Sequence, residues 1–145
     1  MEEVHLQIPA MMKYLQLAIC LCREMCTKIH KTDLGNKFIR DVELCISEAC
    51  TNAIKYGSRK GTDDNISLRF QIYKNKVRII IGDRGKGFDL EEVPEPDVKD
   101  LPESGYGLYI IKAKMDEVKY ERRKDGNYLE MVKYFRDMSG KRSSG

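Results

Sequence analysis

The sequence predicts an α+β two-layer sandwich, with three helices on one face of a mixed, mostly antiparallel sheet of about five strands. Two observations lead to this prediction. Apolar residues recur at helical spacing in two long segments, and shorter segments with alternating apolar residues are separated by turn residues. Because most of these strands follow one another as hairpins, helices gathered on one face of the sheet are the natural packing.

The first half of the chain predicts one strand and two long helices. Alternation indicates a strand over residues 3–8, and apolar residues at helical spacing indicate a helix over 11–30. A second helix, capped by Thr32 or Asp33, is expected to run to about Tyr56, where a glycine follows. Its buried stripe is expected to consist of Phe38, Val42, Cys45, Ile46, Ala49 and Ala53.

The second half predicts two hairpins with a helix between them. Residues 66–72 alternate, and residues 77–81 are more apolar, so we expect these two strands to pair. A shorter helix is expected over 105–114. Strands around 118–120 and over 129–135 complete the sheet, with Asp-Gly as the turn.

One long segment, residues 88–104, shows no period. It holds three of the four prolines and seven carboxylates, Asp89, Glu91, Glu92, Glu95, Asp97, Asp100 and Glu103. A loop of this length inside a compact domain is usually functional or mobile, so we expect it to be protease-sensitive without a ligand. Residues 1–136 are expected to form one domain, and residues 137–145 a flexible tail.

The composition suits a globular domain and excludes several classes of protein. Charged residues make up 34% of the chain, but they are interspersed and the net charge is only +3, which argues against direct nucleic-acid binding. No apolar run approaches the roughly 20 residues of a membrane span, and the N-terminus lacks the shape of a signal peptide. We therefore expect a cytoplasmic protein.

The five cysteines are interpreted as free thiols. Cys22 and Cys26 fall on the apolar stripe of the first helix, whereas Cys20 points elsewhere. The alternative, a metal site built on this cluster, is disfavoured because no second pair of ligands follows at zinc spacing.

Glu48 and Asn52 form the first of three short motifs. They lie one turn apart in the second helix, roughly 40° from each other around its axis, on the shoulder of the apolar stripe. An amide oxygen is a suitable ligand for Mg²⁺, and a nearby carboxylate can accept a proton from a nucleophile that attacks phosphate. Taken alone, the pair fits two solvated residues of an amphipathic helix better.

Asp83, Gly85 and Gly87 form the second motif, directly after the strand over 77–81. A carboxylate here can accept a hydrogen bond from the amino group of adenine, and glycines let the backbone approach a flat base. The alternative is an ordinary tight turn, since aspartate and glycine are common turn residues.

The third motif, Gly105-Tyr106-Gly107, opens the short helix. The free N–H groups at a helix start bind anions, and glycines let phosphate oxygens reach them. The alternative is a glycine hinge at a helix entry. Helix, hairpin, loop and helix follow in the order of an ATP-binding fold that the three motifs together resemble, so the combination favours ATP more than any single motif does.

The three motifs resemble the nucleotide site of the GHKL ATPase/kinase superfamily. From about His5 to Phe135, the chain looks most like the bacterial anti-sigma factor serine/threonine-protein kinases. The resemblance implies the histidine-kinase-like ATPase (Bergerat) fold, with ATP and Mg²⁺ bound. It implies that Asn52 holds Mg²⁺, that Glu48 is the general base and that Asp83 binds adenine. It also assigns nucleotide-binding roles to Gly85, Gly87, Gly105, Tyr106, Gly107 and Leu108, and makes residues 88–104 the ATP lid.

Four positions depart from the family pattern. Tyr56 stands where anti-sigma kinases often have histidine. The lysine before it, Lys55, looks more like a phosphate-approaching lysine of sensor histidine kinases, and is either a phosphate ligand or a solvated side chain. Asn127 stands where a threonine often helps the aspartate hold adenine. Ile19 matches a partner-contacting arginine. Glu103 stands where a basic residue near the γ-phosphate is expected, which bears on catalysis more than on binding.

The resemblance implies an ATP-dependent serine/threonine-protein kinase that acts as an anti-sigma factor. Such a domain is usually a homodimer that either binds a sigma factor or phosphorylates a serine of a small anti-sigma antagonist. Two alternatives are a non-catalytic ATP/ADP-binding regulator and a histidine-kinase-type catalytic domain acting on a separate phosphoacceptor. A third is a basic-surface binding module that takes no nucleotide.

Overall fold

The computed structural model describes residues 1–29, 35–57, 64–87, 106–136 and 142. The predicted helix cap at Thr32 or Asp33, the segment 88–104 and all of the tail except Arg142 lie outside the described residues. The elements are β1 (Glu2–Pro9), the 3-10 helix η1 (Met12–Tyr14), α1 (Leu15–Thr27), α2 (Gly35–Tyr56), β2 (Asn65–Ile72), β3 (Lys76–Asp83), α3 (Tyr106–Lys114), β4 (Glu117–Arg123) and β5 (Gly126–Tyr134).

The sheet has five strands in the order β1-β2-β3-β5-β4. Every pair among the described strands is antiparallel, so the expectation of a mixed sheet was wrong in this detail. The reason is topological. The connection through α3 returns β4 in the direction of β3, but the β4–β5 hairpin places β5 between them. The two strands that run parallel therefore never become neighbours.

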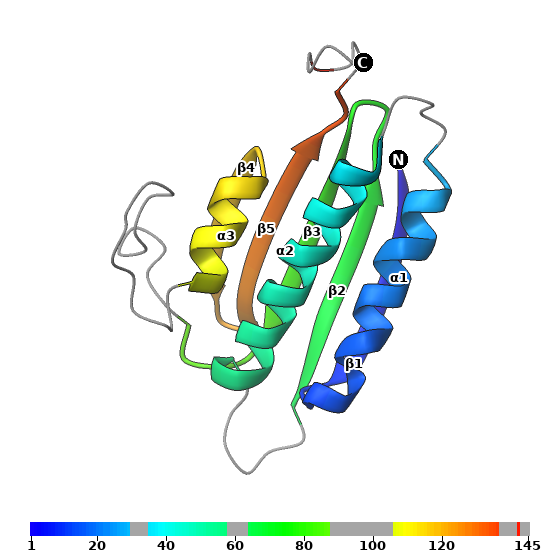
Figure 1. Ribbon diagram of the computed structural model, residues 1–145. Helices are drawn as coiled ribbons and strands as arrows, with labels where there is room; N and C mark the ends of the chain where they lie inside the picture. The colour runs from blue at the N-terminus through cyan, green and yellow to red at the C-terminus, as the bar shows by residue number, and fades with distance from the viewer. Residues whose placement is uncertain (30–34, 58–63, 88–105, 137–141, 143–145) are drawn as a thin grey trace.

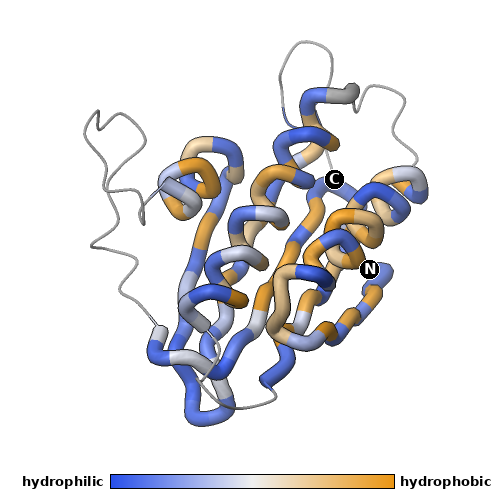
Figure 2. The backbone as a smooth tube through the Cα atoms, turned by 60° about the horizontal axis from the view of Figure 1, so that its bottom comes forward, coloured by the Kyte–Doolittle hydropathy of each residue, from blue (hydrophilic) through white to orange (hydrophobic). Residues whose placement is uncertain are grey.

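The three α-helices of the described chain lie on one face of this sheet, as predicted (Figure 1). α2 lies between α1 and α3 and carries the whole predicted stripe, from Phe38 to Ala53, in the buried core. Cys50 and Ile54 are buried as well. Figure 2 shows the hydrophobic positions recurring along helices and strands, while the turns at the lower end are hydrophilic. Burial of each large apolar side chain contributes about 1.5–3 kcal/mol, so this interface is the main source of stability.

The first predicted helix begins later than expected. Met11 is extended, and Met12–Tyr14 form a 3-10 turn before α1 starts at Leu15. No side chain caps either start, and the amide of Tyr14 bonds to the carbonyl of Met11 at 3.0 Å. The thiols of Cys22 and Cys26 are buried, that of Cys20 is exposed, and all five cysteines are free, as predicted.

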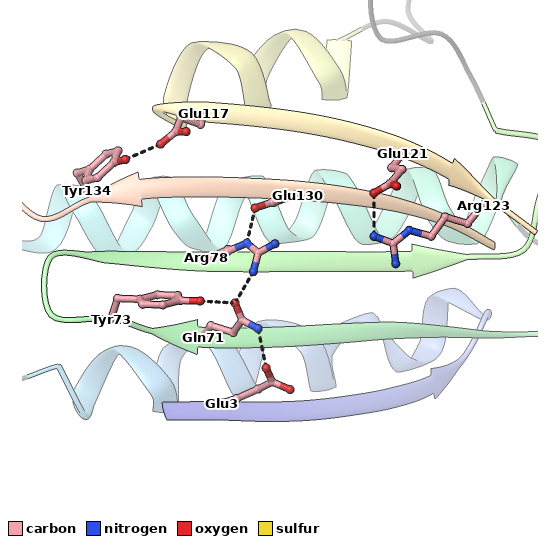
Figure 3. Close-up of polar contacts among 9 residues, drawn as sticks. All are labelled: Glu3, Gln71, Tyr73, Arg78, Glu117, Glu121, Arg123, Glu130 and Tyr134. Atoms are coloured by element: carbon pink, nitrogen blue, oxygen red, sulfur yellow. Dashed lines mark hydrogen bonds and ion pairs between the residues drawn. The ribbon is translucent and has the colours of Figure 1, made fainter. Parts of the chain in front are cut away.

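The opposite face of the sheet is polar. A row of hydrogen-bonded side chains crosses four strands, from Glu3 through Gln71 and Arg78 to Glu130 (Figure 3). Glu3 lies opposite Gln71, and Gln71 opposite Arg78, in the strand register. Gln71 is only 5% exposed, yet its amide donates to Glu3 at 2.6 Å and accepts from Arg78 at 3.1 Å. The row satisfies the hydrogen-bonding groups of the buried Gln71 on a face that carries none of the described helices.

Candidate nucleotide-binding site

The first and third motifs meet where α2 and α3 pack together. A methyl group added to Gly107, in the first turn of α3, would lie 2.9 Å from Oε2 of Glu48 and 3.0 Å from Nδ2 of Asn52. Both side chains are half-buried, and neither hydrogen-bonds to any residue that the structure describes. Their polar atoms are therefore free to bind a ligand at the start of α3. Glycine at position 107 leaves the space that this approach needs.

The second motif is held by a residue from the far end of the chain. Oδ1 of Asp83 accepts hydrogen bonds from the amide of Gly85 at 2.9 Å and from Nδ2 of Asn127 at 3.0 Å. The same Nδ2 donates to the carbonyl of Gly85 at 2.8 Å. Within the described chain, Oδ2 of Asp83 accepts no hydrogen bond. One carboxylate oxygen is thus fixed by the protein, and the other remains for a ligand.

Gly57 brings the end of α2 against this turn. A methyl group on Gly57 would lie 2.5 Å from Cγ of Asp83, and one on Gly85 would lie 2.4 Å from Cα of Gly57. The two backbones therefore touch, which only glycine at both positions allows. This contact joins the helix that carries Glu48 and Asn52 to the turn that carries Asp83.

A cavity of about 200 Å³ opens between these elements. Apart from Asn52 and Asp83, its walls are mainly apolar or aromatic. The lining residues are Ala49, Asn52, Ala53, Tyr56, Gly57, Ile81, Asp83, Gly87, Leu108, Tyr120 and Leu129. An apolar slot with a carboxylate at one end suits a flat ring that carries a hydrogen-bond donor.

The environment of Asp83 changes its acidity. Burial raises the pKa of its carboxyl above the ordinary value, and the hydrogen bonds from Asn127 and the Gly85 amide offset part of the rise. Keeping this carboxylate in an apolar slot thus lowers the stability of the protein, a feature typical of functional sites.

The structure brings together most of the predicted site residues, but not all. Glu48, Asn52, Asp83, Gly85, Gly87, Gly107 and Leu108 gather around the cavity and the α2–α3 contact. Lys55 is exposed on the last turn of α2 and does not line the cavity, so its predicted contact with phosphate stays a prediction. Tyr106 is 47% exposed at the start of α3. Gly105, Glu103 and the predicted lid lie outside the described residues, and Ile19 is partly buried on α1.

Sequence reasoning missed several lining residues. Tyr120 and Leu129 come from β4 and β5, which lie opposite each other in register. Their alternation identified them as strand residues, but no local signal places them in a ligand site. Gly57 was identified only as a helix stop, and Tyr56 only as the last helical residue.

Gly87 has φ of +78°, and a methyl group there would lie 3.0 Å from the hydroxyl of Tyr120.

The residues present fit a magnesium ion that is held mainly by a nucleotide. The described residues contain no group of three or more His, Cys, Asp or Glu side chains that could hold a metal. The alternative of a metal site at the cysteine cluster of α1 is therefore not supported by the described residues. Mg²⁺ keeps several waters and binds phosphate oxygens, so the single amide oxygen of Asn52 would be a sufficient protein ligand.

No helix in the described part of the chain is long and apolar enough to cross a membrane.

Comparison with known proteins agrees with this geometry. The profile of the histidine kinase-like ATPase domain family matches residues 13–133. The chain belongs to that family.

Its relatives include serine-protein kinase RsbW of Oceanobacillus iheyensis, 30% identical over 92% of this chain and 87% of that protein. Serine-protein kinase RsbW of Bacillus cereus strain AH187 is 28% identical over 92% of this chain and 85% of its own length.

Two solved structures share the fold. The crystal structure of the RsbU and RsbW domains from Mycobacterium tuberculosis has a TM-score of 0.68 at 18% identity, over 99% of this chain and 35% of that one. The catalytic domain of histidine kinase ThkA has a TM-score of 0.55 at 16% identity, over 94% of this chain and 99% of that one. At these identities the likeness concerns the fold alone.

Proposed function

We propose that this protein is an ATP-dependent serine-protein kinase that acts as an anti-sigma factor through partner switching. The observation that carries the proposal is the meeting of Glu48, Asn52 and Gly107 at the start of α3. There, two polar side chains that bond to none of the described residues flank a helix N-terminus, which is a site for phosphate. The RsbW relatives, named as serine-protein kinases, support the same activity.

The cavity binds the base of the nucleotide, and the start of α3 binds its phosphates. A volume of about 200 Å³ is below the roughly 300–1,000 Å³ of pockets that enclose a whole small ligand, so the cavity takes the base alone. Oδ2 of Asp83 accepts a hydrogen bond from the adenine amino group, and Leu129 and Ile81 form apolar walls around the ring. The phosphates then lie outside the cavity, at the amides of Gly107 and Leu108.

Glu48 and Asn52 perform different tasks in this proposal. Asn52 would hold Mg²⁺ through its amide oxygen, and the ion would neutralise charge on the phosphates. Glu48 accepts the proton of the attacking serine hydroxyl as the new bond from serine oxygen to the γ-phosphorus forms, while the bond from that phosphorus to the β–γ bridging oxygen breaks and ADP leaves. Tyr106 and Gly105 complete the phosphate-binding segment. Lys55, exposed on the last turn of α2, is a phosphate ligand only if its long side chain reaches back past Asn52.

The partners follow from the same proposal. The phosphoacceptor is a small anti-sigma antagonist protein, and the sequestered protein is a sigma factor. We further propose that the chain works as a cytoplasmic homodimer and does not bind nucleic acid directly. Sedimentation of the purified protein across a range of concentrations tests the dimer, and a constant monomer mass contradicts it.

The decisive experiment is transfer of labelled γ-phosphate from Mg-ATP in an extract of the source organism. Three proteins are compared: wild type, Glu48→Gln and the matched control Glu43→Gln. Glu43 is on the same helix but pairs with Arg23 of α1 at 2.9 Å, away from the site. We expect wild type and the control to label a small protein on serine, and Glu48→Gln to label none.

Other outcomes point to the alternatives. Tight ATP binding without any labelled protein favours a non-catalytic ATP/ADP-binding regulator. Label that is lost in acid, as phosphohistidine is, favours a histidine-kinase-type catalytic domain. Equal labelling by Glu48→Gln contradicts the role of Glu48 as base.

A further inference from the structure

The inference concerns Asp41, a carboxylate on α2 well removed from the cavity. It is only 7% exposed, yet its carboxyl group lies among three lysines. Its Oδ2 is 2.6 Å from Nζ of Lys37 and 4.0 Å from Nζ of Lys133, and its Oδ1 is 3.8 Å from Nζ of Lys114. A buried carboxylate needs such partners, because burial without them is costly.

Two of the three lysines connect Asp41 to the end of α3. Lys114 is the last residue of that helix. Lys133, from β5, donates a hydrogen bond of 2.7 Å to the carbonyl of Lys114, one of the carbonyls that a helix end leaves without a partner. The side chain of Lys133 is only 12% exposed. The C-terminal end of α3 is therefore linked to α2 by the ion pair of Asp41 with the partly exposed Lys114, and to the sheet by the buried side chain of Lys133.

At the other end of α3, Leu108 is buried in the apolar core, and Gly107 lies against Glu48 without a side chain of its own. Asp41 and Glu48 are two helical turns apart on α2, and Lys114 and Gly107 are two turns apart on α3. The ion pair of Asp41 with Lys114 and the contact of Glu48 with Gly107 thus lie in the same antiparallel register of α2 and α3.

We infer that Asp41 is a positioning residue for the nucleotide's phosphates. Asp41 pairs with Lys114 directly, and it pairs with Lys133, which bonds to the carbonyl at the end of α3. These contacts fix the position of α3 along α2. That position decides whether the amides of Gly107 and Leu108 face Glu48 and Asn52. A slide of α3 by one turn, about 5.4 Å, would part the two halves of the phosphate site. This inference rests on the proposed binding of ATP.

The consequence is selective, which separates positioning from general stability. Adenine binds in the cavity beside Asp83, whose lining comes mainly from α2 and the sheet, with Leu108 as the one residue of α3. The phosphates bind at the start of α3. Loss of Asp41 should therefore weaken Mg-ATP more than adenosine, since adenosine lacks the phosphates that α3 contacts.

The test compares Asp41→Asn with the control Glu43→Gln, which makes the same chemical change on the same helix but faces α1. Affinities for Mg-ATP and for adenosine are measured by calorimetry on the full chain. We expect Asp41→Asn to bind Mg-ATP about 3- to 30-fold more weakly, the range for coupling through a packed network, with adenosine nearly unchanged. Glu43→Gln should leave both affinities unchanged.

A second variant covers the case in which Asp41→Asn does not fold. Lys114→Met removes only the α3 side of the contact, at a side chain that is 39% exposed, and should give the same selective loss. Equal loss for both ligands, or unchanged Mg-ATP binding in a folded variant, overturns the role of Asp41. A wild-type protein that does not bind Mg-ATP contradicts the proposed function itself, whereas a normal wild type beside an unchanged variant contradicts only the positioning.

Discussion

The side-chain amide of Asn127 donates a hydrogen bond of 3.0 Å to Oδ1 of Asp83, from a position 44 residues further along the chain. The same group bonds to the carbonyl of Gly85, so one buried amide fixes both the carboxylate and the turn that follows it. Asn127 thereby fixes one oxygen of the carboxylate that we propose binds adenine.

We predict that Asn127→Ala weakens both the fold and the site. The substitution removes one of the two hydrogen bonds to Oδ1 of Asp83 and the side-chain hydrogen bond to the Gly85 carbonyl in a buried setting, which should lower the free energy of unfolding by about 1–3 kcal/mol. Affinity for Mg-ATP should fall as well. Urea denaturation and calorimetry measure the two effects. Asn65→Ala, at an exposed position of β2, is the control, with an expected change within about 0.5 kcal/mol.

We predict that Gly107→Ala separates stability from binding. The added methyl group meets only the tips of Glu48 and Asn52, which can move aside, and alanine favours a helix over glycine by about 1 kcal/mol. The protein should therefore keep or gain thermal stability while Mg-ATP binding and phosphate transfer fall. Ala113→Gly, at an exposed position of α3, should do the reverse: it lowers stability and leaves binding intact. Normal binding by Gly107→Ala would falsify the proposed phosphate site.

We predict that Gly57→Ala destabilises the protein. Its methyl group would lie 2.6 Å from the carbonyl oxygen of Ala53 and 2.5 Å from Cγ of Asp83, and a backbone carbonyl cannot move aside as a side chain does. Overpacking of this kind should lower the free energy of unfolding by about 1–3 kcal/mol. Chemical denaturation measures the change. Wild-type stability together with wild-type ATP affinity would show that the contact between α2 and the Asp83 turn is unimportant.

We predict that stability depends on pH through Asp83. Because burial raises the pKa of this carboxyl in the native state, the native protein binds more protons than the unfolded chain just above the ordinary pKa. The contribution of Asp83 is therefore fully present below the ordinary pKa of about 3.9 and is lost as pH rises through the raised native value. Asp83→Asn lacks this dependence.

The measurement is urea denaturation of wild type and Asp83→Asn at several pH values. The stability of wild type relative to the variant should decline from acid toward neutral pH, while Mg-ATP binding by the variant is lost at neutral pH. A relative stability that rises over this range would show that the hydrogen bonds from Asn127 and Gly85 outweigh burial.

Much of the fold follows from local patterns. The apolar stripe of α2, the alternation of Ile66, Leu68, Phe70 and Ile72, and the turn before β3 are set by spacing that any reader of the chain can count. The start of α1 was predicted less well, because no capping side chain marks it and Met11 and Met12 fit the helical period equally. The strictly antiparallel sheet was missed because sequence order does not reveal that β5 enters between β3 and β4.

The sequence by itself determined the three motifs, because carboxylates, amides and glycines at fixed spacing can be identified one segment at a time. Only the tertiary structure decided how they meet. The contact of Gly57 with Gly85, the hydrogen bond from Asn127 to Asp83 and the ion pairs of Asp41 with Lys114 and Lys133 join residues that lie 28 to 92 positions apart. Such contacts depend on strand register and helix packing, which no local spacing encodes. The motifs therefore indicate the chemistry, and the packing of α2 against α3 and the sheet brings their residues together into one site.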